Sequence, residues 1–558
     1  MFEQEIIKIL KKQIKNLPIE LETPKNPEFG DYSFPCFTVA KTLKKNPAEA
    51  AKQIANKLEK SDLIEKITPV GPYINFFIKK EKIMENTLTK VLKEKENYGN
   101  LNQKQTIVIE SPGPNTNKPL HLGHLRNMAL GLSLANILRK AGNKVINVDI
   151  INDRGIHICQ SMLAYKKYGK NKEPKGKSDH FVGDFYVLYN QKLKQDSSLE
   201  TEAQDLLLKW EQKDPETIKL WNRMNKWALE GMKQTYLRFG MKIDKAYKES
   251  EHYQEGKSLV LEGLSKGIFK KNKEGSVIID LSDDNLGEKV LLRSDGTSIY
   301  ITQDLYLAKK RYNDFKMDKM IYVVASEQEY HFKVLFKLIK LLGFKFADNL
   351  YHLAYGMVHL PEGKMKSREG KIVDADNILD EIHELAKKEL LKRNSKMDKK
   401  ELETKAEAIG LGSVKFFILK YDPLKDFVYD PNKSISFEGE TGPYIQYTYA
   451  RLKSILRKEK PKGKIDYELL NEELEKEIVK DLASYPDLIE KAAKEYKPSL
   501  ITSYLTDLSQ KLNSYYVKYP VLKENQDVKT ARMNLILASS YVLKSGLNLL
   551  GIESLEVM

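Results

Sequence analysis

The sequence has little cysteine and no long apolar run. Only two cysteines occur, Cys36 and Cys159, far apart and in no Cys-x-x-Cys pair. This spacing argues against a disulfide framework and against a cysteine-ligated zinc site. No apolar stretch of about eighteen residues is present to span a bilayer. The N-terminal residues mix acids and bases at helical spacing, which is unlike a signal or transit peptide. We therefore expect a cytoplasmic protein without a membrane span.

Length and charge bound the class of protein. At 558 residues the chain is long enough for about three or four domains of roughly 150 residues each. Hydrophobic residues make up 41% and charged residues 31% of the sequence, as in soluble globular proteins. The formal net charge of +15 favours a polyanionic partner. A lysine-rich composition alone produces the same excess, so the charge is weak support.

One stretch of the sequence has the pattern of strand, loop, helix and strand in immediate succession. Residues 106–109 form a short β-branched run, and residues 111–119 hold three prolines, one glycine and two asparagines, which favour an irregular loop. Apolar residues recur at helical spacing over 125–141 before Gly142, and a second strand-like run covers 145–151. This order predicts a parallel unit with a phosphate-binding crevice at the carboxyl end of its first strand.

Two histidines flank a glycine at the predicted start of this helix. His121 and His124 lie where free backbone N–H groups and the helix dipole favour anions. Gly123 lets a nucleotide approach the backbone, and imidazoles can donate hydrogen bonds to phosphate oxygens during attack at phosphorus. The pattern indicates adenylyl transfer. Ordinary loops and helix caps also contain His-x-Gly-His, and the position between strand and helix is what favours the functional interpretation.

Further strands and helices extend this pattern. Apolar strands are predicted over 320–325 and 351–360, and a helix is predicted from about Tyr300. Tyr300 and Asp304 are four residues apart and share a helix face, which favours one wall of a pocket, with a surface helical pair as the alternative. His180 and His252 have no metal-ligand spacing and are interpreted as surface or hydrogen-bonded groups, so no metal site is expected.

The two ends of the chain differ from its middle. The first hundred residues mix helices with a strand, and a predicted loop over 26–34 carries Phe29, Tyr32 and Phe34, which either stack on unpaired bases or belong to a core. From about Asp374 the pattern is almost wholly helical. We predict an α/β protein with a doubly wound parallel sheet over 101–380, an α/β domain over 1–100 and an all-helical domain over 381–558.

Two separated motifs carry a family resemblance. His121-Leu-Gly-His124 together with Lys364-Met-Lys-Ser-Arg368 resembles the paired signatures of class I aminoacyl-tRNA synthetases, whose core is Rossmann-like. The sequence around them is similar to arginyl-tRNA synthetases over nearly the whole chain. The segments that match in the same order begin at Glu110, Gly296, Glu327 and Thr441.

The resemblance implies a reaction in two steps. L-Arginine and ATP, with Mg²⁺ expected alongside ATP, give arginyl-adenylate and pyrophosphate, and the terminal ribose of the arginine tRNA then takes the arginyl group. In this family the first step usually needs bound tRNA. No zinc is expected, and a monomer is expected.

Site residues follow from matching positions. The resemblance implies that the substrate guanidinium is held by Glu110, Tyr300 and Asp304, and its amino end by Asn115 and Gln328. Carboxylates and a phenol oxygen suit the planar fork of a guanidinium better than the compact ammonium of lysine. ATP would be held by His121, Gly123, His124 and Met365. The catalytic loop would supply Lys364, Lys366, Ser367 and Arg368.

The sequence departs from the class pattern at two places near these motifs. Ser367 stands where the class usually has a lysine, and in arginyl-type enzymes without it the lysine before the histidine motif, here Lys118, is thought to substitute. Gly113 stands where the family more often has serine, which should matter little if only backbone groups face the substrate there.

The resemblance also assigns the ends of the chain. The first hundred residues resemble a domain that meets the tRNA elbow, and residues from about 400 resemble an anticodon-binding domain. Positions near the anticodon in relatives match Tyr444, Arg451, Arg457, Tyr516 and Met558, whose aromatic and guanidinium planes suit splayed bases. Helix packing is the alternative for the tyrosines, and the chain end lacks the Arg-Met of many relatives.

Three other functions fit part of the sequence. Another class I synthetase is the nearest, although a cysteine-specific one would need zinc ligands. A small-molecule adenylyltransferase also uses His-x-Gly-His but has no need of a basic helical C-terminal third. A catalytically silent RNA-binding paralogue is the third, against which the intact His121, His124 and Asp304 argue.

Overall fold

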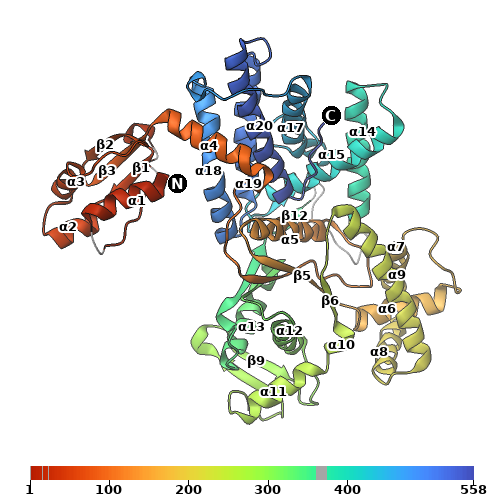
Figure 1. Ribbon diagram of the computed structural model, residues 1–558. Helices are drawn as coiled ribbons and strands as arrows, with labels where there is room; N and C mark the ends of the chain where they lie inside the picture. Colours follow the sequence, from red (N-terminus) through yellow and green to blue (C-terminus); the bar gives the residue numbers. More distant parts are fainter. Residues whose placement is uncertain (1, 15–16, 23, 25, 360–373) are drawn as a thin grey trace. The chain divides into compact units, whose positions relative to one another are not determined.

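The computed structural model describes residues 2–14, 17–22, 24, 26–359 and 374–558 (Figure 1). It divides into two compact units, each described here by itself. Unit 1 holds residues 1–98, 455–484 and 511–542, and unit 2 holds residues 99–454, 485–510 and 543–558. Four long helices contribute residues to both units: α17 (Gly442–Lys458), α18 (Glu473–Glu495), α19 (Ser499–Lys518) and α20 (Gln526–Leu549).

Unit 1 contains the predicted small α/β fold. Its antiparallel sheet has the order β1 (Tyr32–Pro35), β3 (Tyr73–Ile78), β2 (Ile64–Val70), and one core joins it to α1 (Phe2–Gln13), α2 (Phe37–Leu43) and α3 (Pro47–Ala55); α4 (Lys80–Glu94) follows. The predicted loop over 26–34 is wrong in its second half, because strand β1 begins there. Phe34 is 2% exposed and belongs to the core, whereas Phe29 is 45% exposed.

A five-stranded parallel sheet forms the centre of unit 2. Its order is β11 (Leu350–Tyr355), β10 (Lys319–Ala325), β4 (Thr106–Glu110), β5 (Lys144–Ile151) and β6 (Lys245–Lys248). The chain runs from β4 outward to β5 and β6, then returns to the other side of β4 for β10 and β11. This confirms the doubly wound parallel sheet, with its topological switch point at β4.

Alternation along the strands gives the sheet two apolar faces. Val108, Val148 and Met320 share one core with buried residues of α12 (Tyr300–Phe315) and α13 (Glu329–Leu341). Their neighbours in sequence point to the opposite face, on which α5 (Leu122–Lys140) packs against β4, β5 and β10. Because both faces are covered, the central strands β4 and β10 are apolar over most of their length rather than alternating with polar residues.

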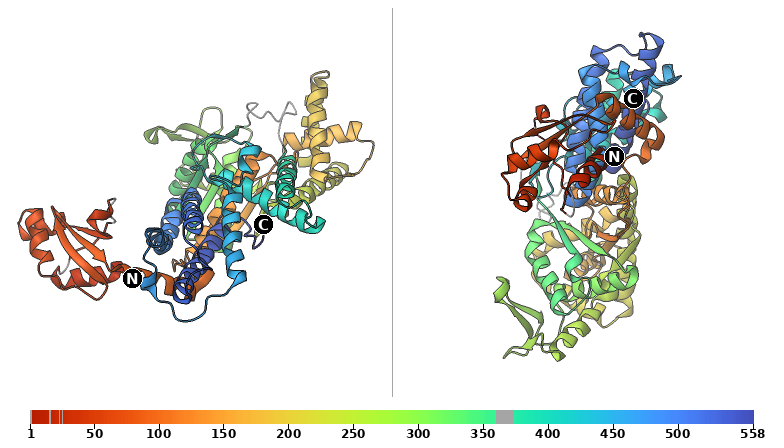
Figure 2. Two further views of the ribbon diagram at one scale, coloured as in Figure 1. Left: turned by 90° about the horizontal axis from the view of Figure 1, so that it is seen from above. Right: turned by 60° about the vertical axis from the view of Figure 1, so that its left-hand side comes forward.

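Two insertions separate the strands of this sheet. Between β5 and β6 lie α6 (Ile156–Tyr168), α7 (Ser178–Leu193), α8 (Ser198–Glu211) and α9 (Pro215–Phe239), which gather into one helical group (yellow in Figures 1 and 2). Between β6 and α12 lie α10 (Glu249–His252), α11 (Glu255–Ser265) and an antiparallel sheet of β7 (Lys270–Lys271), β8 (Val277–Leu281) and β9 (Gly287–Leu292).

The predicted strand over 351–360 is wrong, because it is two strands in different sheets. β11 ends at Tyr355, and β12 (Val358–His359) pairs with β13 (Phe427–Val428). The chain turns at Gly356, whose N–H donates to the carbonyl of Pro423 at 2.9 Å and whose position leaves no room for a Cβ, which would lie 2.4 Å from Asp426 Oδ1. The glycine therefore permits the close approach that ends β11.

Helices follow, as the sequence predicts. They are α14 (Ala375–Arg393), α15 (Lys399–Leu419), α16 (Pro431–Ser434) and then α17 to α20. Short 3₁₀ turns cover Pro27–Phe29, Lys95–Asn97, Ser282–Asp284, Ser326–Gln328, Ala347–Asn349 and Tyr467–Leu469. Within the described ranges, no helix has both the length and the apolarity needed to cross a membrane.

Candidate active site

The carboxyl ends of the parallel strands bring the candidate residues to one edge of the sheet. Glu110 is the last residue of β4, Asp153 follows β5, Glu249 follows β6 and Gln328 follows β10. In an open parallel sheet this edge, beside the switch point, is where ligands bind. The helix that starts directly above β4 is α5, whose first turn contains both motif histidines.

His121 and His124 cap this helix reciprocally. His121 is the N-cap residue, and its Nδ1 accepts a hydrogen bond from the N–H of Gly123 at 3.1 Å. Nδ1 of His124 accepts from the N–H of His121 at 3.0 Å, and the two ring centres are 4.0 Å apart. Because Nδ1 is an acceptor in both rings, the proton of each neutral imidazole lies on Nε2. Capping thus leaves two Nε2–H donors on the helix N-terminus.

Burial keeps these imidazoles uncharged. It lowers the pKa of His121 to about 4, helped by the positive charge of Lys118. It also lowers the pKa of His124 well below its usual value, with His121 and Lys118 contributing. Burial lowers the pKa of Lys118 as well. Near pH 7 the site therefore presents neutral hydrogen-bond donors beside one lysine.

The segment before the histidines is held from several sides. The N–H of Ala375 donates to the carbonyl of Leu120 at 2.9 Å, and His121 forms an isolated antiparallel bridge with Asp374. Gly183 of α7 is packed against this segment, because a Cβ there would lie 2.5 Å from Cδ of Pro119. The helical insertion and α14 therefore fix the position of the motif.

The loop after β4 rests on a buried carboxyl group that the sequence did not indicate. Asp149 of β5 is 1% exposed, accepts from the N–H of Gly113 at 2.9 Å and from the hydroxyl of Tyr236 at 3.0 Å. Burial raises the pKa of Asp149 to about 7. Gly113 has φ +72, a conformation that favours glycine, and its backbone is the group that is bound. Asn115 is exposed and forms a backbone bridge with Asn152.

Several acidic side chains line the crevice, each with a partner. Glu110 is buried and forms an ion pair with Arg311 of α12. Asp304 is hydrogen-bonded to His331 Nε2 at 2.7 Å. Burial raises the pKa of Glu110, the charge of Arg311 lowers it, and the charge of Asp304 raises it again. The two predicted residues Glu110 and Asp304 therefore lie within electrostatic range of each other. The guanidinium of Arg311 therefore already pairs with one carboxylate oxygen of Glu110.

Glu249 is a further carboxylate that sequence reasoning missed. It is 8% exposed, accepts from Gln303 Nε2 at 3.2 Å and lies 3.7 Å from an Arg154 guanidinium nitrogen. Burial raises its pKa, and the charges of Asp153 and Asp304 add to this, so the Glu249 carboxylate lies within electrostatic range of both. The available signal was its position directly after a parallel strand.

The remaining predicted substrate residues are open to solvent. Tyr300 is 76% exposed at the start of α12, and Gln328 is exposed at the start of α13. The structure thus places Tyr300 one helical turn before Asp304, as expected, but does not close a wall around it. The predicted loop residues Lys364, Met365, Lys366, Ser367 and Arg368 lie outside the described residues.

One interpretation of a lone histidine needs correction. His180 contacts Asp374 at 3.2 Å and Asp376 at 3.1 Å, and these hydrogen bonds raise its pKa to about 10. In the described part of the chain, Asp179, His180 and Asp376 are the one group with metal-ligand spacing. Lys177 Nζ already lies 2.8 Å from Asp179 and 2.7 Å from Asp376. His180 is therefore hydrogen-bonded, as one of the two predicted alternatives held, and what needs correction is its isolation, because it belongs to a charge network with metal-ligand spacing.

The predicted tRNA contacts are distributed along the helical region. Tyr444 and Arg451 lie on α17, and Arg451 stacks over the Tyr447 ring at 4.8 Å. Arg457 is exposed near the end of the same helix, Tyr516 is 45% exposed on α19, and Met558 ends the chain half-buried. Tyr444, Arg451 and Met558 belong to unit 2, and Arg457 and Tyr516 belong to unit 1.

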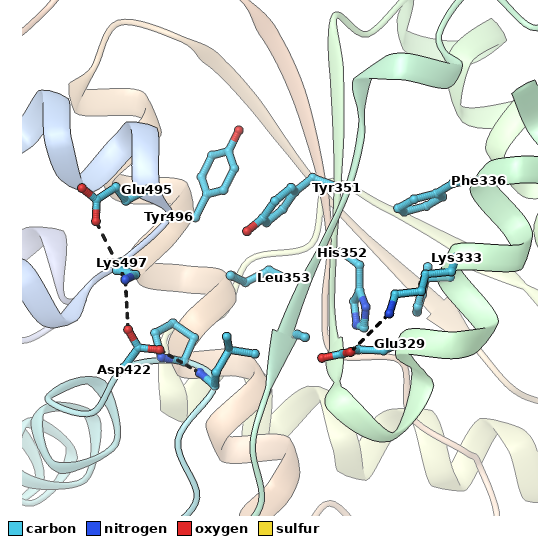
Figure 3. A pocket seen from close by; sticks show the side chains of 14 residues that line it. Glu329, Lys333, Phe336, Tyr351, His352, Leu353, Asp422, Glu495, Tyr496 and Lys497 are labelled. Carbon is cyan, nitrogen blue, oxygen red and sulfur yellow. Dashed lines mark hydrogen bonds and ion pairs between the residues drawn. The ribbon is translucent and has the colours of Figure 1, made fainter. Parts of the chain in front are cut away.

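A cavity of about 300 Å³ lies beside edge strand β11 (Figure 3). Tyr351 and Tyr496 meet there with ring centres 4.7 Å apart, and Lys497 forms an ion pair with Asp422 at 3.1 Å. The described residues that line it include none of the predicted site residues.

Family models match three successive parts of the chain. The model described as "tRNA synthetases class I (R), catalytic domain" matches residues 87–431, which contain the parallel sheet and both histidines. Fold and site therefore define a class I aminoacyl-tRNA synthetase. The models for the "Arginyl tRNA synthetase N terminal domain" and the "DALR anticodon binding domain" match residues 1–78 and 445–558.

Full-length relatives make the assignment specific. The arginine–tRNA ligase of Treponema denticola is 47% identical over 99% of this chain and 96% of its own length. That of Parabacteroides distasonis is 41% identical over 97% of this chain and 96% of its own length. The chain belongs to the arginyl-tRNA synthetase family, which ligates L-arginine to its tRNA through arginyl-adenylate at the expense of ATP.

A solved structure agrees with this assignment. The arginyl-tRNA synthetase of Thermus thermophilus superposes with a TM-score of 0.83 at 26% identity, covering 100% of this chain and 99% of that one. The predicted fold class and family are thereby confirmed, while the roles of single residues stay predictions.

Proposed function

We propose that the crevice at the carboxyl ends of β4, β5, β6 and β10 is where this chain activates L-arginine with ATP. The observation that carries the proposal is the reciprocal histidine cap, which leaves two neutral Nε2–H donors at a helix N-terminus. Donors fixed before the reaction stabilise charge that develops on a phosphate without reorganising. A neutral imidazole whose Nδ1 accepts a backbone N–H has its one proton on Nε2, which can be donated to a phosphate oxygen.

The acidic end of the crevice supports recognition of the arginine side chain. We assign the guanidinium to Asp304 and Glu249, with the exposed Tyr300 able to turn inward, and Glu110 supplies a third carboxylate nearby. Two neighbouring carboxylates suit a planar cation with several donors. Asn115 and Gln328 are assigned to the amino end, and Lys118 supplies the cation beside the phosphates.

The remaining assignments concern partners and location. We propose that Lys364, Lys366, Ser367 and Arg368 act with Met365 on ATP, which arrives with Mg²⁺ as part of the substrate. Tyr444, Arg451, Arg457, Tyr516 and Met558 are assigned to the anticodon end of the arginine tRNA, and residues 1–100 to its elbow. We further propose three functional parts, 1–100, 101–380 and 381–558, in a cytoplasmic monomer. Binding of tRNA should weaken with salt, because phosphate contacts release counterions.

Pyrophosphate exchange tests the proposal. It is measured with each of the twenty amino acids, with and without total tRNA. Exchange for arginine alone, appearing only with tRNA, is expected. Exchange for another amino acid would overturn the roles of Asp304 and Glu249, and none at all would favour a silent paralogue.

A variant that keeps the helix cap but lacks the imidazole tests whether the Nε2–H donor of His121 takes part in the reaction. His121→Asn keeps an oxygen that caps the helix but removes the Nε2 donor. Its turnover should fall by about 10²–10³-fold, the usual effect of one transition-state donor, with an unchanged melting temperature. His157→Asn, at an exposed histidine of α6, is the control and should leave both quantities unchanged. Full turnover by His121→Asn would remove the histidine from the mechanism.

A further inference from the structure

His180 joins the helical insertion to the start of α14. It lies in the first turn of α7, and its Nε2 is 3.2 Å from a carboxylate oxygen of Asp374 and 3.1 Å from one of Asp376. Because an ionised carboxylate can only accept, Nε2 is the donor in both contacts. These hydrogen bonds raise the pKa of His180 to about 10, so its ring is a cation near pH 7.

Asp374 also contacts the histidine motif. Its backbone pairs with that of His121 in an isolated antiparallel bridge, and the N–H of the next residue, Ala375, donates to the carbonyl of Leu120 at 2.9 Å. Its charge reaches the imidazole as well, because burial lowers the pKa of His121 and the charge of Asp374 raises it. Asp374 is therefore a neighbour of the first motif histidine both through the backbone and through its charge.

The same face of α7 contacts this segment a second time. Gly183 follows His180 by three residues and therefore lies on the same face of the helix. A Cβ on Gly183 would lie 2.5 Å from Cδ of Pro119 and 3.6 Å from Cα of Lys118. One face of α7 thus meets the segment before the motif directly at Gly183, and through Asp374 at His180.

Capping of α14 explains the contact with His180 poorly. Asp374 is the N-cap residue and already accepts from the N–H of Asp376 at 2.8 Å. Asp376 in turn contacts Lys177 at 2.7 Å and Thr235 at 3.1 Å. An acidic residue at a helix N-terminus is stabilised by the helix dipole without any cation, and a partly exposed ion pair adds little to stability. The contact is better explained by its effect on the motif.

We propose that His180 is a positioning residue for His121. Its cationic ring holds the carboxylate of Asp374, and the backbone pairing of Asp374 with His121 carries this restraint to the imidazole that donates to the phosphates. A shift of about 1 Å in a catalytic group can cost about 10²-fold in rate. The inference rests on the proposed function, since it takes His121 as a donor to the nucleotide.

The kinetics of His180→Ala separate positioning from substrate binding. In arginine-dependent pyrophosphate exchange with tRNA, turnover should fall about 10–100-fold. The KM values for L-arginine and ATP should stay within about twofold, because the donor acts on charge that develops during the reaction. His180→Lys keeps a cation at this partly exposed position and should recover most of the turnover. His157→Ala, at an exposed histidine of α6 in the same insertion, is the control and should leave turnover and KM unchanged.

A double-mutant cycle tests whether His180 acts through His121. His121→Asn keeps the helix cap but lacks the Nε2 donor, so no donor is left to position. In that background His180→Ala should lower turnover by less than about twofold, a large departure from additivity. A residue that only supports the fold would lower turnover by the same factor in both backgrounds. If His180→Ala does not fold, His180→Gln replaces it in the cycle, because the amide keeps one hydrogen bond and loses the charge, and the same coupling is expected.

Three results would overturn the role of His180 and leave the proposed function intact. They are wild-type turnover in His180→Ala, raised KM values with normal turnover, and an undiminished effect of His180→Ala in the His121→Asn background. Turnover of His180→Lys as low as that of His180→Ala would overturn the part played by the charge. Wild-type protein without arginine-dependent exchange would instead overturn the proposed function together with this inference.

Discussion

Replacing Asp149 by asparagine should make stability less dependent on pH. Burial raises the pKa of this carboxyl from 3.8 to about 7. The folded chain therefore binds a proton below about pH 7, whereas the unfolded chain stays ionised until about pH 4. Folding takes up a proton between these values, so the contribution of Asp149 to the free energy of unfolding falls as the pH rises towards 7. The full range amounts to about 4 kcal/mol at about 1.4 kcal/mol per pKa unit.

Asparagine can keep both contacts without a charge. Its Oδ1 can accept from the N–H of Gly113, and its Nδ2 can donate to the oxygen of Tyr236. Of the interval from pH 5 to pH 8.5, about two pH units lie below the pKa of Asp149, and only over these two units does folding take up a proton. Relative to wild type, the variant should therefore gain about 3 kcal/mol of unfolding free energy at pH 8.5 compared with pH 5.

Urea unfolding at the two pH values measures this change. All three tryptophans, Trp210, Trp221 and Trp227, lie in unit 2 with Asp149, so their fluorescence reports the unit concerned. Comparing variant with wild type in the same buffer cancels the titration of other groups. Asp205→Asn, on an exposed position of α8, is the control and should show the same difference at both pH values. An equal difference for Asp149→Asn, or a larger loss at pH 8.5, would refute the reasoning.

Three further substitutions test other parts of the structure. Lys118→Ala should lower turnover in pyrophosphate exchange by about 10²–10³-fold, and a raised KM with normal turnover would contradict its role beside the phosphates. Gly183→Ala should slow the same reaction by about 10²-fold, because the added Cβ would lie 2.5 Å from Cδ of Pro119 and displace the histidine motif. Gly176→Ala is the control and should leave the rate unchanged, because a Cβ there would have no atom within 4 Å. Arg532→Met should lower the unfolding free energy by about 3–5 kcal/mol, because it strands the fully buried Glu475 that it contacts at 3.0 Å, and an added Glu475→Gln should recover part of the loss in urea unfolding.

The parts of the fold that sequence reasoning predicted are those with local signals. The strand, loop and helix around His121 follow from a β-branched run, three prolines and a terminal glycine, all within the segment itself. The break of β11 at Gly356 was missed because its cause is distant: Asp426 and Pro423 approach the backbone from another part of the chain. A continuous apolar run therefore looked like one strand.

The same contrast applies to the site. His121 and His124 were found because strand and helix patterns flank them. Glu249 follows a strand of four residues, which is too short to show an alternation, and its neighbour Asp304 comes from a separate helix. Arg311 is about 200 residues from Glu110, and no local pattern reports a pairing at that separation. Residues that pair with a partner so distant in the sequence can be recognised only when the fold is known.

The histidine cap links folding to chemistry. Each Nδ1 accepts a backbone N–H, so the bonds that start α5 also fix the tautomer of both rings. Burial and the charge of Lys118 lower the pKa of His121 to about 4, so the ring stays neutral near pH 7. If both ring nitrogens carried a proton, Nδ1 could no longer accept the N–H of Gly123. Protonation of His121 would therefore remove the cap and the phosphate-donor geometry together. The burial that disfavours this charge is what lets one pair of residues both begin the helix and present donors to a nucleotide.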